Sequence, residues 1–376
     1  MIVPKAEHGV VCSLGGDFFG YFGWPSVTRM DDGTLLAAAS GLRNEHVCPY
    51  GRTVLFRSGD EGRSWSSPRV IHDSPLDDRD AGIVSLGGSR VLVTWFTVDI
   101  RSHWEHGFAG RDRDAVFAQW RTGCEWFRDG QIPRFVGSWV RTSDDAGATF
   151  SPPRKVAVTT PHGPIRLAGG RLLYLGKVFG ETSADHRNSD RPIVAIASDD
   201  GGESWQTLGA VPLHAGTSAQ CYHEPHVVEL PDGKLVGLIR FQSHSGIDVT
   251  EQGLTDFSLM QTESADGGKT WTPARPLGFH GSPPHLLRHS SGALVCVYGC
   301  RLAPFGQRAA VSRDGGQTWT HDLALRDDGP DSDLGYPCSV ELPDASIFTL
   351  YYQKPAPGQK CAVLWTRWRV PDKGEL

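Results

Sequence analysis

Six short segments spread over the chain combine the residue types that transfer protons with those that bind anions. Each contains His, Asp, Glu, Arg or Tyr and few aliphatic residues. The segments are 20–25, 76–80, 160–164, 222–226, 281–285 and 333–337. Histidine and carboxylic acids act as general acids and bases, and arginine holds carboxylates through paired hydrogen bonds. If the fold brings these segments together, they form a concave polar site in which catalysis is expected.

Each polar segment is followed by an apolar stretch, a tight turn and a second apolar stretch, which is the pattern of a β-hairpin. The six turns contain Gly33, Gly88, Gly170, Gly233, Gly292 and Ala345. Six hairpins predict an all-β fold, a six-bladed β-propeller of four-stranded antiparallel blades formed by residues 1–376 as a single domain. We expect the first strand of each hairpin to be innermost, so that the polar segments line a funnel around the central axis.

A second repeat follows five of the six hairpins. It reads Ser-x-Asp-x-Gly-x-(Ser/Thr)-(Trp/Phe) and begins at Ser58, Ser143, Ser198, Ser264 and Ser312. In such a turn the Asp accepts backbone hydrogen bonds, the Gly adopts a backbone angle that other residues resist, and the aromatic ring packs beneath. The repeat is structural and resembles the Asp-box of sialidase-type β-propellers. The sixth hairpin is followed by residues 362–368 instead.

Composition and charge narrow the class of protein. The net charge is −6 and no basic stretch occurs, which argues against a nucleic-acid partner. No apolar run reaches the ~20 residues of a membrane span. The N-terminus lacks the features of a signal peptide, so we expect a cytoplasmic protein whose eight cysteines are free thiols. No Cys/His cluster has zinc-site spacing, and neither a metal nor another cofactor is expected. Association into a homo-oligomer is left open.

The second half of the chain resembles the sialidase family of glycoside hydrolases in the spacing of four residues. Glu224 and Arg240 are sixteen residues apart, on the first strand and at the end of the second strand of one hairpin. Arg308 shortly precedes the fifth repeat and is followed by Tyr336. The resemblance implies that Tyr336 is the nucleophile and Glu224 its base. Arg240 and Arg308 would then clamp the carboxylate of an acidic glycan or oligosaccharide, a substrate that would repel a carboxylate nucleophile.

The first half departs from that family at the clamp. Where the family has an Arg two residues before a Pro, this chain has Gly23 before Pro25. The first arginine of the clamp is therefore missing. Arg43 or Arg52, from the loop that follows, would have to reach into the site to replace it.

The family's acid/base Asp is also absent. His46 stands at its place on the loop before the first repeat. A histidine can carry out the same proton transfer near neutral pH, so we predict that His46 is the general acid. Glu45 remains an alternative, as do the three acids of the next polar segment, Asp77, Asp78 and Asp80.

Further substrate contacts are predicted from the inner segments. Residues 77–80 lie where the family's second blade approaches the sugar, so Arg79 and Asp80 are predicted to bind substrate. Four histidines of the inner segments are each either a substrate contact or a structural hydrogen-bonding residue. They are His162, His223, His226 and His285, of which we select His162 and His285 as substrate-binding.

These observations favour a sialidase-like exo-glycoside hydrolase acting on sialic acid or a related keto-sugar acid. The alternatives are a glycosidase or polysaccharide lyase acting on a uronic acid, or a carbohydrate-binding propeller without turnover. A contact between Tyr336 and Glu224 would favour the hydrolase, and a contact between Tyr336 and a His the lyase. A site blocked by Trp24 or Trp104 would favour the binding protein. The insert 99–137 would cover the funnel or form a subunit contact.

Overall fold

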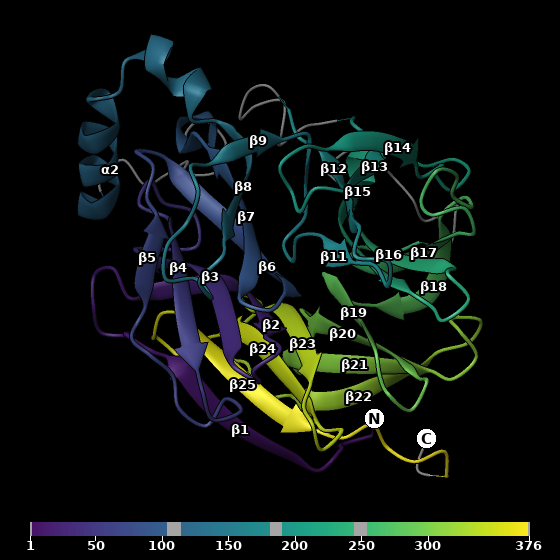
Figure 1. Cartoon of the computed structure of the whole chain (residues 1–376). Coiled ribbons are helices and arrows are strands. Elements are labelled where there is room, and N and C mark those ends of the chain that lie inside the picture. Colours follow the sequence, from purple (N-terminus) through teal and green to yellow (C-terminus); the bar gives the residue numbers. More distant parts are fainter. Residues whose placement is uncertain (1, 104–113, 181–189, 244–253, 375–376) are drawn as a thin grey trace.

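The computed structural model describes residues 2–103, 114–180, 190–243 and 254–374 and contains six antiparallel sheets arranged in a ring (Figure 1). The sheets are the blades of a β-propeller, so the predicted fold class is confirmed. Within each blade the strands are ordered from the axis outward. The first strands of the blades pack against one another around the axis, as the hairpin pattern predicted.

The first three blades follow one another along the chain. Blade 1 contains β2 (Tyr21–Arg29), β3 (Leu35–Arg43), β4 (Arg52–Ser58) and β5 (Arg69–His72). Blade 2 contains β6 (Asp77–Gly87), β7 (Arg90–Val98), β8 (Gly137–Ser143) and β9 (Arg154–Val156). Blade 3 contains β10 (Val158–Thr159), β11 (Ile165–Arg166), β12 (Leu172–Val178), β13 (Ile193–Ser198) and β14 (Gln206–Ala210). Its inner strand is interrupted, because β10 and β11 both pair with β12.

The last three blades complete the ring. Blade 4 contains β15 (Tyr222–Glu229), β16 (Leu235–Phe241), β17 (Ser258–Ser264) and β18 (Arg275–His280). Blade 5 contains β19 (Pro284–Arg288), β20 (Leu294–Cys300), β21 (Gly306–Ser312) and β22 (Thr320–Arg326). Blade 6 contains β23 (Gly335–Glu341), β24 (Ile347–Gln353), β25 (Ala362–Trp368) and β1 (Ala6–Cys12).

Apolar side chains fill the spaces between neighbouring blades. Leu36 and Leu55 of blade 1, for example, are buried against Ile83 and Val93 of blade 2. Burial of a side chain of this kind is worth about 1.5–3 kcal/mol. The blades are therefore held to one another by apolar contacts, which fix the inner ends of their first strands relative to the axis.

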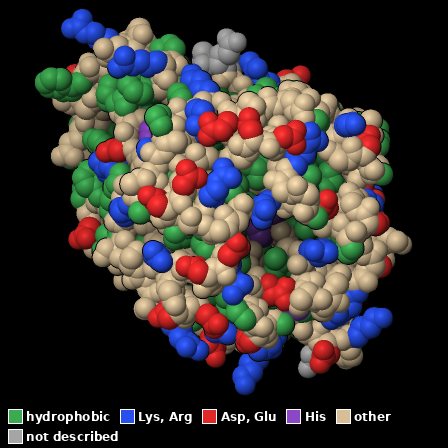
Figure 2. Space-filling view, in the orientation of Figure 1, with side chains coloured by type: hydrophobic (Ala, Val, Ile, Leu, Met, Phe, Trp, Pro, Cys, Tyr) green, Lys and Arg blue, Asp and Glu red, His purple; other side chains and the backbone are tan. Residues whose placement is uncertain are grey.

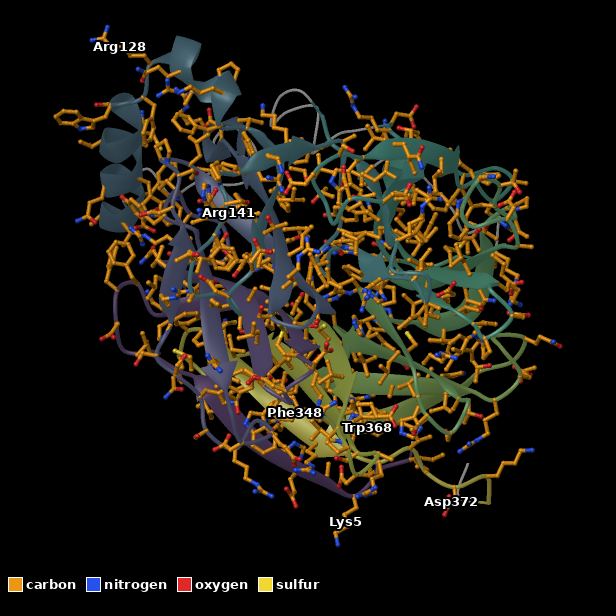
Figure 3. The ribbon with its side chains drawn as sticks, in the orientation of Figure 1. Lys5, Arg128, Arg141, Phe348, Trp368 and Asp372 are labelled. Atoms are coloured by element: carbon orange, nitrogen blue, oxygen red, sulfur yellow. The ribbon has the colours of Figure 1, made fainter. Side chains whose placement is uncertain are left out.

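The ring is closed by strands from the two ends of the chain. β1 is the outermost strand of blade 6 and pairs with β25, with Ala6 opposite Trp368. Lys5 and Trp368 accordingly lie at the same edge of the molecule (Figure 3). This closure explains why five repeats accompany six hairpins. The repeat forms the turn from the third to the fourth strand, and blade 6 has no such turn because its fourth strand is β1.

The five turns share one set of hydrogen bonds. In the first, Asp60 accepts from the backbone N and the Oγ of Ser64 at 2.9 and 2.6 Å, and the Gly62 N donates to Ser58 Oγ at 2.9 Å. Gly62 has φ +86°, and Trp65 Nε1 donates to its carbonyl at 3.0 Å. The hydrogen bonds from Ser64 lower the pKa of Asp60 to about 2. The same contacts to the Asp recur at Asp145, Asp200, Asp266 and Asp314.

The described part of the 99–137 insert contains α2 (Ala115–Glu125) and two short 3₁₀ helices, η1 (Ile100–His103) and η2 (Asp129–Arg134). A third, η3 (Ala219–Cys221), precedes β15. α2 lies outside the ring, where Phe117 and Trp120 are buried against Cys48 and pack on Val47 (Figure 1). The helix thus supports the loop after β3. Trp104 lies outside the described residues. None of the described helices has the length and apolar character needed to cross a bilayer.

Candidate active site

Four of the innermost strands each hold one residue in the left-handed backbone conformation. These residues are Trp24, Asp80, Glu224 and Tyr336, with φ between 47° and 53°. Each lies at an irregularity in the pairing with the second strand of its blade. Such a conformation costs about 1–3 kcal/mol in a non-glycine residue and is concentrated at functional sites. The bulge takes these side chains out of the normal alternation of the strand.

Three of these four residues line a cavity of about 320 Å³. Figure 2 shows a hollow near the middle of the face in view, with acidic, basic and His side chains around it. The polar residues of the lining are His46, Arg79, Asp80, Thr159, Thr160, Lys177, His223, Glu224 and Tyr336. The apolar residues are Val47, Phe96, Val98 and Pro161. The cavity is therefore formed mainly by the polar segments predicted to meet at the axis.

Tyr336, Glu224 and Arg240 form one hydrogen-bonded group beside this cavity. The Tyr336 Oη donates to Glu224 Oε1 at 2.5 Å. Arg240 Nη1 donates to Glu224 Oε2 at 2.5 Å and to Tyr336 Oη at 3.1 Å. Burial and the adjacent Glu224 carboxylate hold the pKa of Tyr336 well above its usual value, while Arg240 opposes them. The structure thus brings together residues from blades 4 and 6 that are 112 positions apart.

Two further arginines lie near Tyr336. The guanidinium of Arg301, which follows β20, is 5.7 Å from the centre of the Tyr336 ring and donates to Leu334 O at 3.0 Å. Arg79 stacks at 4.2 Å over the ring of Trp24, which itself lies 6.3 Å from the Tyr336 ring. Arg79 is one of the predicted residues. Arg301 was missed; it lies just after the second strand of blade 5, whereas Arg240 is the penultimate residue of the second strand of blade 4.

Arg308 does not join this group. Its guanidinium donates to the backbone carbonyls of Gln307 at 3.2 Å and Pro304 at 2.9 Å, and also to that of Arg326. The residue is buried and does not line the cavity. The predicted clamp role therefore does not fit its position, because its donors are used to hold the turn between β20 and β21.

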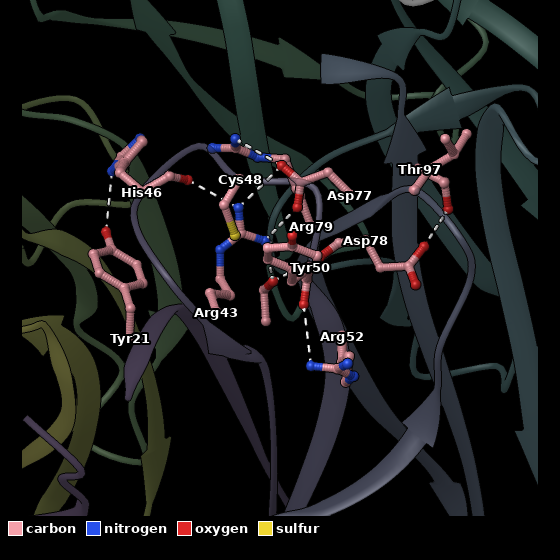
Figure 4. A network of polar contacts seen from close by, with 12 residues as sticks. Tyr21, Arg43, His46, Cys48, Tyr50, Arg52, Asp77, Asp78, Arg79 and Thr97 are labelled. Atoms are coloured by element: carbon pink, nitrogen blue, oxygen red, sulfur yellow. Dashed lines mark hydrogen bonds and ion pairs between the residues drawn. The ribbon is translucent and has the colours of Figure 1, made fainter. Parts of the chain in front are cut away.

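Arg43 is likewise not placed for substrate binding. It donates to Asp77 at 2.5 and 3.0 Å, and both side chains are completely buried (Figure 4). A further N–H donates to the carbonyl of His46 at 2.9 Å. Arg52 pairs with Asp73 at 3.2 Å outside the cavity. Neither arginine replaces the missing one, and Arg43 instead fixes the backbone of the loop that carries His46.

The three acids of the second polar segment have separate positions. Asp77 forms the buried ion pair with Arg43. Asp78 is buried and accepts from Thr97 Oγ1 at 2.6 Å, and burial raises its pKa to about 7. Asp80 alone lines the cavity. Burial raises the pKa of Asp80 to about 7, with Arg79 opposing the shift and the charge of Glu224 adding to it.

His46 lines the cavity and is held from behind by two polar groups. Its Nδ1 lies 2.8 Å from Asp333 Oδ1 and 3.0 Å from Tyr21 Oη. Figure 4 shows the contact with Tyr21. Glu45, the alternative on the same loop, does not line the cavity. Among the candidates for general acid, His46 and Asp80 therefore remain.

His162 and His285 lie outside the cavity lining, with His226, in one buried group. His226 stacks on His285 at 4.2 Å, and His162 meets His285 edge-on at 5.1 Å. The Nδ1 of His162 lies near Ser26 Oγ, that of His226 accepts from the Leu286 N, and that of His285 accepts from the Ser339 N. Burial lowers the pKa of all three, to about 3 for His226. Their positions fit structural hydrogen bonding, whereas His223 does line the cavity.

Lys177 was not predicted from the sequence. It lines the cavity, and its Nζ donates to the carbonyls of Ala219 at 3.1 Å and Tyr222 at 2.9 Å. Burial lowers its pKa to about 8. It is the penultimate residue of β12, an otherwise apolar strand, and no motif marks it.

A larger hollow of about 960 Å³ lies beside the pairing of β1 with β25 that closes the ring, and none of the predicted site residues lines it. Lys5, Phe348 and Trp365 are among its lining, and Arg367 there pairs with Glu61 and Asp344. The volume of a hollow therefore does not by itself identify the candidate active site. Within the described ranges, no group of three or more His, Cys, Asp or Glu could hold a metal ion.

Comparisons with known proteins agree with the fold. The sequence profile of the family of BNR repeat-like domains matches residues 118–349. The anhydrosialidase of Macrobdella decora is 26% identical over 242 residues, which are 56% of this chain and 29% of that protein. The match thus spans less than a third of the relative's length.

Solved structures of the same fold cover nearly the whole chain. A protein of unknown function from Dyadobacter fermentans has a TM-score of 0.74 at 22% identity, covering 97% of this chain and 98% of its own. The intramolecular trans-sialidase of Ruminococcus gnavus has a TM-score of 0.63 at 17% identity, with 96% and 97% covered. The sialidase of Trypanosoma rangeli in complex with sialic acid has 0.63 at 14% identity, with 97% and 59% covered.

Proposed function

This chain belongs to the family of BNR repeat-like domains within the sialidase superfamily, and on that premise we propose that it is a sialidase-like exo-glycoside hydrolase. It removes a terminal acidic sugar, sialic acid or a related keto-sugar acid, from a glycan. The observation that carries the proposal is the 2.5 Å hydrogen bond from Tyr336 Oη to Glu224 Oε1 at the wall of the cavity.

In the first step Glu224 accepts the phenolic proton of Tyr336. The Tyr336 oxygen forms a bond to the anomeric carbon as the glycosidic bond breaks, and His46 gives a proton to the departing oxygen. In the second step His46 takes a proton from water, whose oxygen attacks the same carbon. Tyr336 leaves and recovers its proton from Glu224. An uncharged nucleophile suits a sugar that bears a carboxylate at its reacting carbon.

Three arginines support the preference for an acidic sugar. Arg240 donates to Tyr336 Oη at 3.1 Å, and the guanidinium of Arg301 lies 5.7 Å from the centre of the Tyr336 ring. Both place positive charge beside the wall of the cavity, which favours a substrate that carries a carboxylate. Arg79, stacked on Trp24, supplies a third positive charge in place of the arginine missing at Gly23.

The alternatives receive less support. A polysaccharide lyase would pair its Tyr with a His, whereas Tyr336 pairs with Glu224 and His46 contacts Tyr21 and Asp333. A site blocked by Trp24 would favour a binding protein without turnover. Trp24 does not close it, because this ring is buried under Arg79 while a cavity remains above Tyr336.

The test is release of fluorophore from a 4-methylumbelliferyl α-sialoside. We expect turnover by the wild type and a loss of about a thousandfold or more in Tyr336→Phe. Tyr351→Phe is the matched control, because the Tyr351 hydroxyl is also buried but contacts Thr366 at 2.8 Å in blade 6. Equal losses in both variants would contradict the assignment. A wild type inactive on sialosides but active on uronic-acid glycosides would change the substrate.

A further inference from the structure

One carboxylate contacts the side chain of His46. Asp333, in the polar segment before β23, places Oδ1 at 2.8 Å from His46 Nδ1. We propose that Asp333 and His46 form a carboxylate–histidine pair, in which His46 is the general acid and base of the cavity and Asp333 is its positioning residue. The inference rests on the proposed function. The pair takes the place of the family's acid/base aspartate, which this chain lacks.

The hydrogen bonds around Asp333 determine where the proton lies. Tyr21 Oη donates to both carboxylate oxygens at 3.0 and 3.2 Å, and Cys361 Sγ contacts Oδ2 at 3.5 Å. Burial acts to raise the pKa of Asp333, but the hydrogen bonds from His46 and Tyr21 outweigh it and keep the carboxyl ionised. An ionised carboxylate can only accept. The proton of the His46 contact is therefore on Nδ1, which leaves Nε2 as the nitrogen that exchanges protons with substrate.

The position of His46 is fixed from several elements. Arg43 holds its backbone carbonyl at 2.9 Å, and the edge of the ring lies against Trp24 at 5.0 Å. Tyr21 and Asp333 hold Nδ1 from blade 1 and blade 6. A proton donor held in this way loses little entropy when the substrate binds, which favours rapid transfer.

The charges that face His46 couple it to the substrate. Burial lowers the pKa of His46, the hydrogen bond and charge of Asp333 raise it, and the positive charges of Arg79 and Arg301 lower it further. A substrate carboxylate bound between these arginines would offset their effect. Protonation of His46 is then favoured in the complex, at the moment when an acid is needed.

His46 ends the two-step reaction with the same number of protons as it began. In glycosidic cleavage the Nε2 proton moves to the leaving oxygen, and in hydrolysis a proton of the attacking water returns to Nε2. Asp333 neither gains nor loses a proton. Its contribution is to hold the ring and to stabilise the imidazolium.

Asp80 is the competing proton donor, because it also lines the cavity and has a pKa raised by burial to about 7. Dependence on the leaving group separates the two. An aryl leaving group departs without protonation, whereas the sugar alcohol of sialyllactose needs an acid. Loss of the acid should therefore affect sialyllactose far more than the 4-methylumbelliferyl sialoside.

The experiment compares both substrates in His46→Ala, Asp333→Asn, Asp80→Asn and the control Asp199→Asn, whose partner Arg171 lies outside the cavity. We expect His46→Ala to lose about 10²–10⁴-fold on sialyllactose and much less on the aryl sialoside. Asp333→Asn should show the same selective loss, of about tenfold or more, with a shifted pH profile. Asp199→Asn should resemble the wild type, and added imidazole should partly restore His46→Ala.

Three outcomes would overturn the proposal. The first is a selective loss in Asp80→Asn but not in His46→Ala. The second is an equal loss on both substrates in a folded Asp333→Asn. The third, should Asp333→Asn not fold, is a Tyr21→Phe variant whose pH profile matches the wild type, because Tyr21 holds the same carboxylate. A wild type without activity on either sialoside would refute sialic acid as the substrate in the proposed function.

Discussion

Replacement of Arg43 by Met should lower the free energy of unfolding by about 4 kcal/mol. Removing one partner of a buried ion pair costs about 3–5 kcal/mol, because the other charge is left buried and uncompensated. Here both side chains have an exposed fraction of 0%. Of its side-chain contacts with described residues, Asp77 would keep that with Arg79 at 3.3 Å, and the carbonyl of His46 would lose the Arg43 donor. Met fills much of the space of Arg, so the loss is one of charge and hydrogen bonds.

The assay is urea unfolding at pH 7 followed by fluorescence of the twelve tryptophans. Arg52→Met is the matched control, because Asp73, its partner, is 52% exposed and such a pair is worth about 0–1 kcal/mol. A cost for Arg43→Met no larger than that for Arg52→Met would refute the reasoning. Unchanged stability with a raised KM would show instead that Arg43 binds substrate.

Three other predictions concern the cavity. Glu224→Gln keeps the size of the side chain but removes the base, so kcat on the aryl sialoside should fall by about 10²–10⁴-fold, and a KM effect alone would contradict the role. Arg301→Met should reduce kcat/KM by about 10–100-fold, because a charged hydrogen bond to the substrate is lost. Arg308→Met should instead lower the free energy of unfolding and leave KM unchanged. The reverse pattern would show that Arg308, and not Arg301, binds the substrate carboxylate. Because burial raises the pKa of Asp80, its ionisation opposes folding, and stability from this group falls as the pH rises from about 4 to 7. Asp80→Asn should therefore lose less stability than the wild type between pH 5 and pH 8 in urea titrations, and parallel curves would argue against this.

The sequence predicted the blades because each hairpin turn is marked locally. The turn glycines at Gly33, Gly170 and Gly233 all have positive φ, and apolar strands flank them. The pairing of Glu224 with Arg240 was also within reach, since both residues lie on one hairpin and their spacing follows from the strand lengths. Local patterns of this kind need no knowledge of the other blades.

The orientation of the remaining arginines could not be read in the same way. Whether Arg43 points into the cavity depends on Asp77, which belongs to another blade. Arg308 is taken up by carbonyls of its own blade, and Arg301 lies just beyond a strand end that the sequence does not mark. These outcomes depend on contacts between segments far apart in the chain.

The histidines were misplaced for a related reason. His162 and His285 lie in polar segments, as Glu224 does, but Glu224 is in the left-handed bulge position and lines the cavity, whereas these two histidines do neither. A bulge shifts the alternation of a strand by one residue, and the sequence alone does not show where the extra residue is inserted.

The seam between β1 and β25 determines the order in which the molecule can be completed during synthesis. Among the strands of the propeller β1 is made first, and its partner β25, whose Trp368 pairs with Ala6, is made last. Blades 1 to 5 each consist of contiguous sequence and can form one after another, whereas blade 6 must wait until both β1 and β25 have been made. Until then β1 is an unpaired strand that other chains could capture. Release of the last blade from the ribosome is therefore the event that ends this exposure.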